Sequence, residues 1–390
     1  MANGRLLFVV NDTSFFLSHR LPVALAARNA GYEVALAALD TGGVDQIRAH
    51  GIAYHPLVVD RTGLNPLRDA GLLAQLLRLI RAARPTIVHA VTIKPVVYGG
   101  IVARMLGVPG LVSAISGLGI VFVGGDRGKS WVRWVARLLY GLALGHDNSC
   151  AIFQNPDDLR DMVEAGLVPR DRTVLIRSSG VDVSVFRPSP PPPGPPVVIM
   201  PARLLWPKGV GEFVEAARLL HEAGVSVRMA LVGRPVRHHP SSVAQCEIDS
   251  WVAQGLIEWW GHCPDMVRVY ERCHVVCLPS YYGEGVPRVL IEAAACGRPV
   301  VTTDFRGCRE AVKHGDNGLL VPPRSPEALA DAVRLLAESP ELRSKMGRRG
   351  RERAVAEFSL DRVVGATLAV YEHLRASASA RKVSSAAQSG

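Results

Sequence analysis

Residues 188–196 read PSPPPPGPP, so seven of these nine positions are proline. Proline lacks a backbone N–H and fixes its φ angle, so the stretch can join neither a helix interior nor the middle of a sheet. A run of this kind forms a stiff, extended connector. We therefore expect one domain on each side of it, residues 1–187 and 197–375, each within the usual domain size of about 100–200 residues. The Ser- and Ala-rich residues 376–390 are expected to be disordered.

The chain on both sides of the proline run alternates short apolar runs with amphipathic stretches. In the first half the pattern predicts strands at 6–10, 33–39, 86–91 and 110–114, and helices at 21–30 and 69–83. In the second half it predicts strands at 197–200, 227–232, 257–260, 274–278 and 299–303, and helices at 209–223, 289–296, 326–338, 340–358 and 359–375. The last of these helices could return to pack on the first domain.

This alternation of strands and helices predicts an α/β protein with two Rossmann-like, doubly wound parallel sheets. Ligands of such sheets bind at the carboxyl ends of the strands. Two such edges facing each other would make a deep cleft that could hold two substrates.

The composition excludes several classes of protein. With 48% apolar and 21% charged residues, the chain is not disordered as a whole. No apolar run reaches about 20 residues, so no membrane-spanning helix is expected, and the start MANGRLLFVVND does not resemble a secretory signal. The seven cysteines contain no C-x-x-C pair, which argues against a zinc or disulfide framework and favours the reducing cytoplasm.

The charge of the chain favours an anionic partner. An excess of 45 basic over 35 acidic side chains gives a net charge of +10, which suits an anionic small molecule, an anionic membrane surface or a nucleic acid. Because aromatic residues make up only 6% of the chain, a nucleic-acid binder that stacks bases is not favoured.

The segment Pro279–Cys296, PSYYGEGVPRVLIEAAAC, carries the clearest chemical pattern. A predicted strand leads into a glycine-containing loop and then into a helix, so backbone N–H groups near the helix N-terminus could bind a diphosphate. Glu284 lies in the loop and Glu292 in the helix. A carboxylate there could accept hydrogen bonds from the vicinal hydroxyls of a ribose. Two solvated acids at a helix entry are the plain alternative, which the strand, loop and helix around them make less favoured.

A second segment, Pro201–Gly209, follows the first strand of the second half and reads PARLLWPKG. Arg203 and Lys208 would leave the strand end together, and two cations could stabilise a diphosphate as a leaving group. Two surface cations would give the same pattern. Gly233 ends the next predicted strand, where a small residue would let a nucleobase approach the backbone, although glycine after a strand is common.

Arg203-x4-Lys208 followed by Glu284-x7-Glu292 resembles glycosyltransferase family 4, retaining enzymes with the GT-B fold. The resemblance runs from about residue 5 to 375. The stretches FLSHRLP (16–22), LWPKG (205–209) and LPSYYGEGVPRVLIEAAACGRPVV (278–301) most resemble the bacterial members that extend sugars linked to a polyprenyl diphosphate.

The resemblance implies a role for each of these residues. Arg203 and Lys208 would hold the donor diphosphate, Glu292 the ribose, and Glu284 the hydroxyls of the transferred sugar. The phosphate side would be lined by Gly285, Val286, Pro287 and Arg288. The acceptor would attack from the front face, so that no protein nucleophile, metal or cofactor is needed. The resemblance makes UDP-N-acetylgalactosamine the leading donor, with other UDP- and GDP-sugars open.

The first half departs from the family pattern at two places. The loop 11–19 lacks the paired glycines of many members, so acceptor or phosphate contacts would come from Ser14, His19 or Arg20. Many members also carry a histidine just after the fourth strand. Here His89 falls within the strand and is interpreted as a core residue, whereas Lys94 in the following loop could bind a lipid diphosphate.

The stretch Arg127–Gly145 predicts an amphipathic helix rich in tryptophan and cations. Its apolar residues at helical spacing are Trp131, Trp134, Val135, Leu138, Leu139 and Leu142, mixed with Lys129, Arg133 and Arg137. Such a helix suits an anionic lipid interface, and a basic chain would add to that attraction. We therefore expect peripheral attachment to the cytoplasmic face of the inner membrane. An ordinary helix packed on the domain, or one that opens an acceptor groove, would give the same pattern.

Two other functions share the expected architecture. A sugar-nucleotide epimerase or hydrolase would need an acid–base pair on the donor sugar and no lipid acceptor, and the Trp/Arg helix counts against it. A non-catalytic binding protein would not need to keep Arg203, Lys208, Glu284 and Glu292 together.

Overall fold

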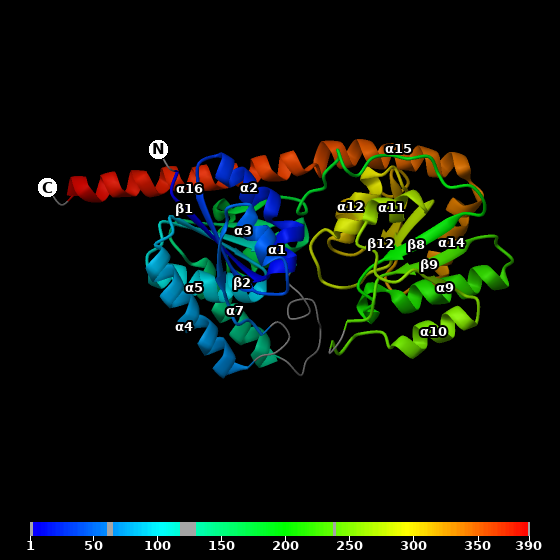
Figure 1. Ribbon diagram of the computed structural model, residues 1–390, viewed down its shortest axis with the longest axis horizontal. Coiled ribbons are helices and arrows are strands. Elements are labelled where there is room, and N and C mark those ends of the chain that lie inside the picture. The colour runs from blue at the N-terminus through cyan, green and yellow to red at the C-terminus, as the bar shows by residue number, and fades with distance from the viewer. Residues whose placement is uncertain (1–2, 61–64, 118–129, 237–238, 389–390) are drawn as a thin grey trace. The chain divides into compact units, whose positions relative to one another are not determined.

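The computed structural model describes residues 3–60, 65–117, 130–236 and 239–388; within these, the side chains of 130–133 and 382–388 are not described. Its contacts divide the chain into two compact units (Figure 1). The N-terminal unit comprises Met1–Ser179 and Asp361–Gly390, and the C-terminal unit comprises Gly180–Leu360. Each unit is an α/β domain with its own core.

In the N-terminal unit, the described residues form a seven-stranded sheet in the order β3-β2-β1-β4-β5-β6-β7. Each neighbouring pair of these strands is parallel. The strands are β1 (Arg5–Asp12), β2 (Glu33–Leu39), β3 (Ala53–Pro56), β4 (Ile87–Val91), β5 (Gly110–Ile115), β6 (Ser149–Phe153) and β7 (Thr173–Leu175). Every residue of β4 and β5 is buried, as expected for parallel strands covered by helices on both faces.

Local signals set the helices of this unit. Asp12 caps α1 (Thr13–His19) by accepting a hydrogen bond from the Phe15 N–H at 2.8 Å, and Asn65 caps α4 (Pro66–Ala83) in the same way. The other helical segments are α2 (Leu21–Asn29), α3 (Val44–Ala49), the π-helical turn η1 (Pro95–Gly99), α5 (Gly100–Met105), α7 (Ser130–Leu144), α8 (Pro156–Glu164), the short turn η3 (Arg170–Arg172) and α16 (Leu360–Gln388).

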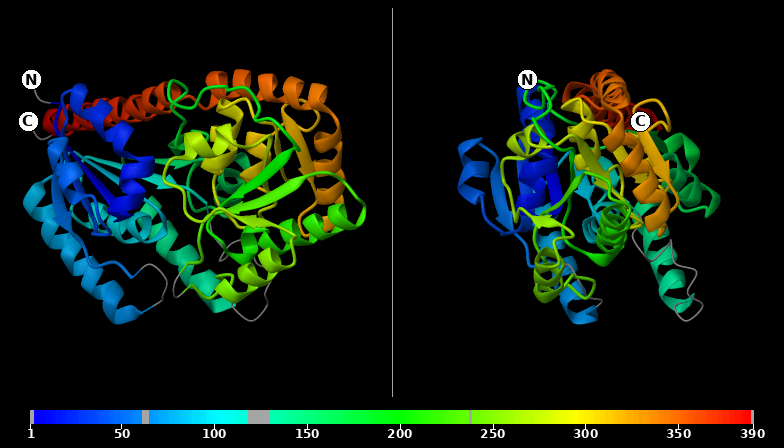
Figure 2. Two further views of the ribbon diagram at one scale, coloured as in Figure 1. Left: turned by 45° about the vertical axis from the view of Figure 1, so that its right-hand side comes forward. Right: turned by 90° about the vertical axis from the view of Figure 1, so that its right-hand side faces the viewer.

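In the C-terminal unit, six strands of the described chain pair in parallel in the order β10-β9-β8-β11-β12-β13. They are β8 (Val197–Pro201), β9 (Arg228–Val232), β10 (Glu258–Trp259), β11 (Val275–Leu278), β12 (Val300–Thr303) and β13 (Gly318–Val321). The helical segments are η4 (Trp206–Lys208), α9 (Val210–Glu222), α10 (Gln245–Ala253), α11 (Met266–Glu271), α12 (Arg288–Ala295), α13 (Cys308–Ala311), α14 (Pro326–Glu338) and α15 (Pro340–Glu357). One pair of packed helices, α9 and α14, and a second pair, α12 and α15, cover this sheet (Figure 2).

The strand orders confirm the prediction of two doubly wound parallel domains. In the C-terminal sheet, β8 lies between β9 and β11. Strands β9 and β10 are added on one side of β8 and strands β11 to β13 on the other, so the strand order reverses at the β8–β11 pair. The carboxyl ends of the two strands on either side of such a switch point form the usual ligand-binding crevice of this sheet type. Pro201 ends β8 and Leu278 ends β11, so the predicted segments 201–209 and 279–296 both begin at this point.

The proline run belongs to the C-terminal unit, and the units divide between Ser179 and Gly180, before it. The buried guanidinium of Arg298 donates hydrogen bonds to Ser189 Oγ at 2.7 Å and to the Pro190 carbonyl at 3.2 Å. The run is therefore fastened to its own domain, because a proline-rich backbone still offers carbonyl acceptors to a side-chain donor.

The C-terminal segment differs from the expected disordered tail. Helix α16 continues to Gln388, since no proline or glycine interrupts residues 366–389 and alanine is the strongest helix former. Its apolar face, which includes Val370 and Tyr371, packs in the same core as α1 and α2 of the N-terminal unit (Figure 1).

Candidate active site

The candidate site is built on two chain segments that cross just beyond β8 and β11. After β8, the 3-10 turn η4 ends at Lys208, and Gly209 follows with a φ of +85°. A Cβ atom at Gly209 would lie 2.3 Å from the Pro279 carbonyl oxygen, so only glycine permits this approach. The Tyr281 N–H donates to the Pro207 carbonyl at 3.0 Å. These contacts hold Lys208 against the loop that follows β11.

Lys208 and Glu284 form an ion pair at this crossing. The Lys208 ammonium contacts Glu284 Oε1, and the two side chains are only 8% and 22% exposed. The Ser280 hydroxyl donates to the same carboxylate oxygen at 3.2 Å, and the Lys208 Nζ atom lies 5.4 Å from the centroid of the Tyr282 ring. Lys208 and Glu284, two of the predicted site residues, are thus in contact, whereas the sequence analysis did not single out Ser280 and Tyr282.

The loop that carries Glu284 is held by the end of β12 and by Gly307, which follows it. Gly307 has a φ of +79°, and a Cβ atom there would lie 2.0 Å from the Gly285 carbonyl oxygen and 2.6 Å from that of Glu284. The buried hydroxyl of Thr303 donates to the Ser280 carbonyl. The position of the Glu284 carboxylate therefore depends on backbone contacts with a segment about 20 residues further along the chain.

Glu292 occupies a second, buried position on α12. Its side chain is 7% exposed. Oε2 accepts a hydrogen bond from the Tyr270 hydroxyl at 2.9 Å, and Oε1 pairs with the Arg288 guanidinium at 2.8 Å. Helix α12 begins after Pro287 without a side-chain cap hydrogen bond. Because Pro287 carries no N–H, the backbone donors of the predicted phosphate stretch are those of Gly285, Val286 and Arg288.

The other two predicted residues of this domain lie differently. The Arg203 side chain is exposed, and no hydrogen bond or ion pair of its guanidinium occurs within the described part of the chain. Gly233 has a φ of +142°, and a Cβ atom there would lie 1.9 Å from the Ala202 carbonyl oxygen. The need for glycine at position 233 is thus explained by backbone packing beside β8, whatever ligand the site binds.

Four residues of the N-terminal unit were predicted to contact the acceptor or a phosphate, and three of them make local side-chain contacts. The Ser14 hydroxyl bonds to Thr41 Oγ1 at 2.8 Å. The ring of His19 stacks on Phe15 at 4.3 Å, and its Nδ1 bonds to Ser18. Lys94 forms an ion pair with Asp69 at 2.7 Å, with both side chains largely buried. Their acceptor or phosphate roles stay predictions.

Arg20 lies in the core of the N-terminal unit rather than at its surface. Its side chain is 4% exposed, and burial lowers its pKa to about 10, an effect that the nearby Tyr371 partly offsets. The neighbouring His89 is fully buried and bonds through Nδ1 to the Tyr371 hydroxyl at 2.5 Å. Burial, and secondly the Arg20 charge, lower the pKa of His89 well below its usual value. These contacts fit the interpretation of His89 as a core residue.

Helix α7 exposes an apolar stripe. Trp134, Leu138 and Leu142 follow one another at intervals of four residues and are 66%, 50% and 44% exposed. The opposite side of the helix is buried and includes Tyr140 and Leu144. The predicted contributions of Lys129, Trp131 and Arg133 lie outside the described side chains. Among the helices that the structure describes, none combines the length and apolarity required to cross a bilayer.

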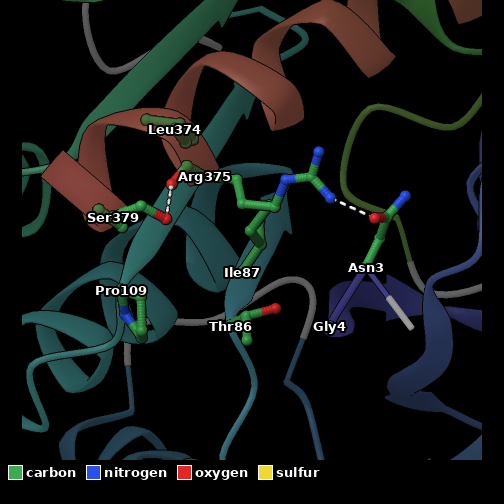
Figure 3. Close-up of a pocket in the computed structure, with 9 residues that line it drawn as sticks. Asn3, Gly4, Thr86, Ile87, Pro109, Leu374, Arg375 and Ser379 are labelled. Atoms are coloured by element: carbon green, nitrogen blue, oxygen red, sulfur yellow. Dashed lines mark hydrogen bonds between the residues drawn. The ribbon is translucent and has the colours of Figure 1, made fainter. Parts of the chain in front are cut away.

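A pocket of about 270 Å³ lies in the N-terminal unit beside α16 (Figure 3). Gly4, Thr86 and Pro109, which line it, precede β1, β4 and β5, so the pocket lies at the amino ends of the strands. Arg375 crosses it to bond with Asn3 (Figure 3). Because ligands of parallel sheets bind at the carboxyl ends, we do not assign this pocket to the candidate site.

Two family models match the chain. Residues 5–152 match the family described as "Glycosyl transferase 4-like", and residues 184–353 match "Glycosyl transferases group 1". The second match contains Lys208, Glu284 and Glu292.

Individual proteins are similar over nearly the whole chain. The N,N'-diacetylbacillosaminyl-diphospho-undecaprenol alpha-1,3-N-acetylgalactosaminyltransferase of Campylobacter jejuni is 26% identical, over 87% of this chain and 93% of that protein. Among solved structures, HepE of Anabaena in complex with UDP superposes with a TM-score of 0.74 at 19% identity, over 95% of this chain and 100% of that one. A sucrose-phosphate synthase of Thermosynechococcus elongatus gives 0.77 at 20% identity, over 96% and 99%.

Proposed function

Since this chain is a glycosyltransferase of the GT-B fold, with its two halves matching the 4-like and group 1 families, we propose that it transfers a sugar with retention from a nucleotide donor to a saccharide on a polyprenyl diphosphate. The observation that carries this proposal is the Lys208–Glu284 pair at the switch point of the C-terminal sheet. In this proposal Lys208 is the cation for the leaving phosphate and Glu284 the carboxylate for the sugar hydroxyls.

The proposed chemistry needs only groups of this kind. The bond between the sugar C1 and the diphosphate oxygen breaks while the acceptor oxygen bonds to C1 from the same face. The acceptor proton passes to the departing phosphate oxygen. The Lys208 ammonium has three N–H donors, so it can stabilise the charge that develops on that phosphate while keeping its contact with Glu284. Arg203, exposed near the end of β8, would contribute the second positive charge, and neither a metal nor a cofactor takes part.

The identities of donor and acceptor are proposed from relatives. The Campylobacter jejuni protein carries N-acetylgalactosaminyltransferase and diphospho-undecaprenol in its name, and HepE was solved with UDP. We propose UDP-N-acetylgalactosamine as donor and an undecaprenyl-diphosphate-linked saccharide as acceptor, which places the chain with the transferase type of that relative. UDP-N-acetylglucosamine, UDP-galactose and GDP-linked sugars are the other donors to compare.

The proposal is tested by offering a panel of UDP- and GDP-sugars with and without a prenyl-diphosphate-linked saccharide. We expect nucleotide diphosphate release only when both substrates are present, an α-linked product by NMR from an α-linked donor, and unchanged rates in EDTA. A changed sugar without release would instead indicate an epimerase. Release without acceptor would indicate a hydrolase, and silence across the panel a binding protein.

We also propose that the enzyme attaches to the cytoplasmic face of the inner membrane through α7. The exposed stripe of Trp134, Leu138 and Leu142 offers apolar area and a tryptophan for the headgroup region. The net charge of +10 favours anionic lipid. Attachment would bring a soluble domain to an acceptor whose lipid tail stays in the bilayer.

Leu138→Glu is expected to weaken binding to phosphatidylglycerol-containing vesicles at low salt by about tenfold or more, because one buried leucine contributes about 1.5–3 kcal/mol and the new charge is repelled by the lipid. Co-sedimentation measures the effect. Leu335→Glu is the matched control, since Leu335 is 49% exposed on α14 of the other unit. Equal vesicle binding of the two variants, or no binding by the unmodified enzyme, would refute attachment through α7.

A further inference from the structure

Tyr270, at the end of α11, supports the Glu292 carboxylate from inside the C-terminal domain. The Tyr270 side chain is fully buried. Its hydroxyl lies 2.9 Å from Glu292 Oε2 and 3.3 Å from the Val289 carbonyl, so the shorter and charge-assisted bond is the one to Glu292. Tyr270 precedes Glu292 by 22 residues and belongs to a different helix.

The two partners of Glu292 divide its carboxylate evenly. Tyr270 bonds to Oε2 and Arg288 pairs with Oε1. An ionised carboxylate has about four lone-pair positions, two on each oxygen. Among the described residues, the protein thus uses one position on each oxygen and leaves one on each. Two acceptors on neighbouring oxygens match the two vicinal hydroxyls of a ribose.

The tyrosine is fixed at both ends and stays protonated. Burial, with the Glu292 charge as a second cause, raises the pKa of Tyr270 well above its usual value, so its hydroxyl acts as a donor. The buried Arg298 donates through Nε to the Tyr270 carbonyl at 2.9 Å. The ring meets Phe186 edge-on, with 6.1 Å between centroids. A donor held this firmly can set the orientation of the carboxylate it bonds to.

We propose that Tyr270 is a positioning residue that holds Glu292 so that both of its oxygens accept the ribose hydroxyls, and that the enzyme thereby selects ribonucleotide over deoxyribonucleotide donors. The inference rests on the proposed function, because it takes Glu292 to bind the ribose of the nucleotide donor, the role that the family resemblance implies. Without the Tyr270 hydroxyl, the carboxylate keeps the single tether to Arg288 and can rotate away from one of the two hydroxyls. Tyr270 itself does not touch the donor.

The test compares UDP with 2′-deoxy-UDP by calorimetry on the full-length enzyme, its Tyr270→Phe variant and a control. We expect the unmodified enzyme to prefer UDP by about tenfold to hundredfold, the effect of one hydrogen bond to a charged group. In Tyr270→Phe we expect the preference to fall below about threefold, mainly through weaker UDP binding. With donor sugar, KM should rise while kcat changes little. Tyr32→Phe is the control, because it removes another buried tyrosine hydroxyl, in the N-terminal unit. It should change neither the preference for UDP over 2′-deoxy-UDP nor KM.

Phenylalanine keeps the ring contact with Phe186 and the backbone bond from Arg298, and a melting curve checks that the variant folds. Glu292→Gln tests the same inference independently. This variant should lose the preference for UDP over 2′-deoxy-UDP by itself, and adding Tyr270→Phe to it should not change the ratio of the two affinities further. A Tyr270→Phe enzyme that keeps its preference, or a further loss on adding it to Glu292→Gln, overturns the inference. So does an unmodified enzyme that binds both nucleotides equally, even if it transfers sugar. An unmodified enzyme that binds neither UDP nor GDP instead removes the proposed function, and the inference with it.

Discussion

Lys208→Ala is expected to lower kcat by about 10²–10³-fold, the usual loss when a dedicated stabiliser of developing charge is removed from a site. Lys208 is 8% exposed, so the phosphate it would contact is shielded from water and its charge is weakly screened. KM should rise less than kcat falls, because the charge on the leaving oxygen is largest in the transition state. Steady-state rates with the preferred donor and acceptor measure both.

The control must separate catalysis from folding, because removal of Lys208 leaves Glu284 without its ion-pair partner. The double variant Lys208→Ala/Glu284→Gln removes both charges and should melt closer to the unmodified enzyme than Lys208→Ala does. Its kcat should stay low. Glu284→Gln alone should reduce kcat more than nucleotide affinity. A Lys208→Ala enzyme with near-normal kcat would exclude Lys208 from the mechanism.

Gly307→Ala is expected to lower kcat by about 10²-fold although residue 307 contacts no substrate in the proposed mechanism. Its new methyl group would overlap the carbonyl oxygens of Gly285 and Glu284 and push the loop away from Lys208. A displacement of about 1 Å at a reacting group can cost about 10²-fold in rate. The overlap should also destabilise the fold by about 1–3 kcal/mol beyond the strain of a positive φ.

Gly315→Ala is the matched control for this variant. Gly315 has a similar φ of +77°, but a methyl group there meets nothing within 4 Å. It should therefore cost about 1–2 kcal/mol of stability from the backbone conformation alone and leave kcat unchanged. Denaturant unfolding and steady-state rates on the two variants, side by side, isolate the contact with the loop. An equal kcat in the two variants would contradict the prediction, because it would mean that displacing the Glu284 loop does not affect the reaction.

The sequence predicted the doubly wound architecture because buried parallel strands leave a strong local signal. The run Leu6–Val10 in β1 is continuously apolar and is followed by Asn11 and Asp12, and every residue of β8, which reads VVIMP, is apolar and buried. Strand β3, at the sheet edge, reads AYHP and has no buried residue, and β7 has three half-buried residues. Strands this short and this exposed have no hydrophobic pattern to find, and only pairing with a neighbour defines them.

The candidate site was predictable as far as its residues follow strand ends. Lys208 and Glu284 each lie within a few residues of a strand that borders the switch point, so topology alone brings their segments together. Tyr270 reaches Glu292 from a separate helix, and no spacing in the sequence indicates that contact. Arg20, which the sequence analysis took as a possible acceptor or phosphate contact, is 4% exposed, and no local pattern indicates that burial because basic side chains are mostly exposed.

The Lys208–Glu284 contact also bears on how a donor would reach the enzyme. Opposite charges in contact cancel at a distance, so in the unliganded protein the pair exerts little pull on a dianion several ångströms away. The donor would instead be attracted from bulk solution by exposed cations such as Arg203. Their electrostatic attraction is screened within a Debye length of about 8 Å at physiological ionic strength. The rate of encounter would then vary with the salt concentration. The rate of the chemical step, beside the buried Lys208, would depend little on it.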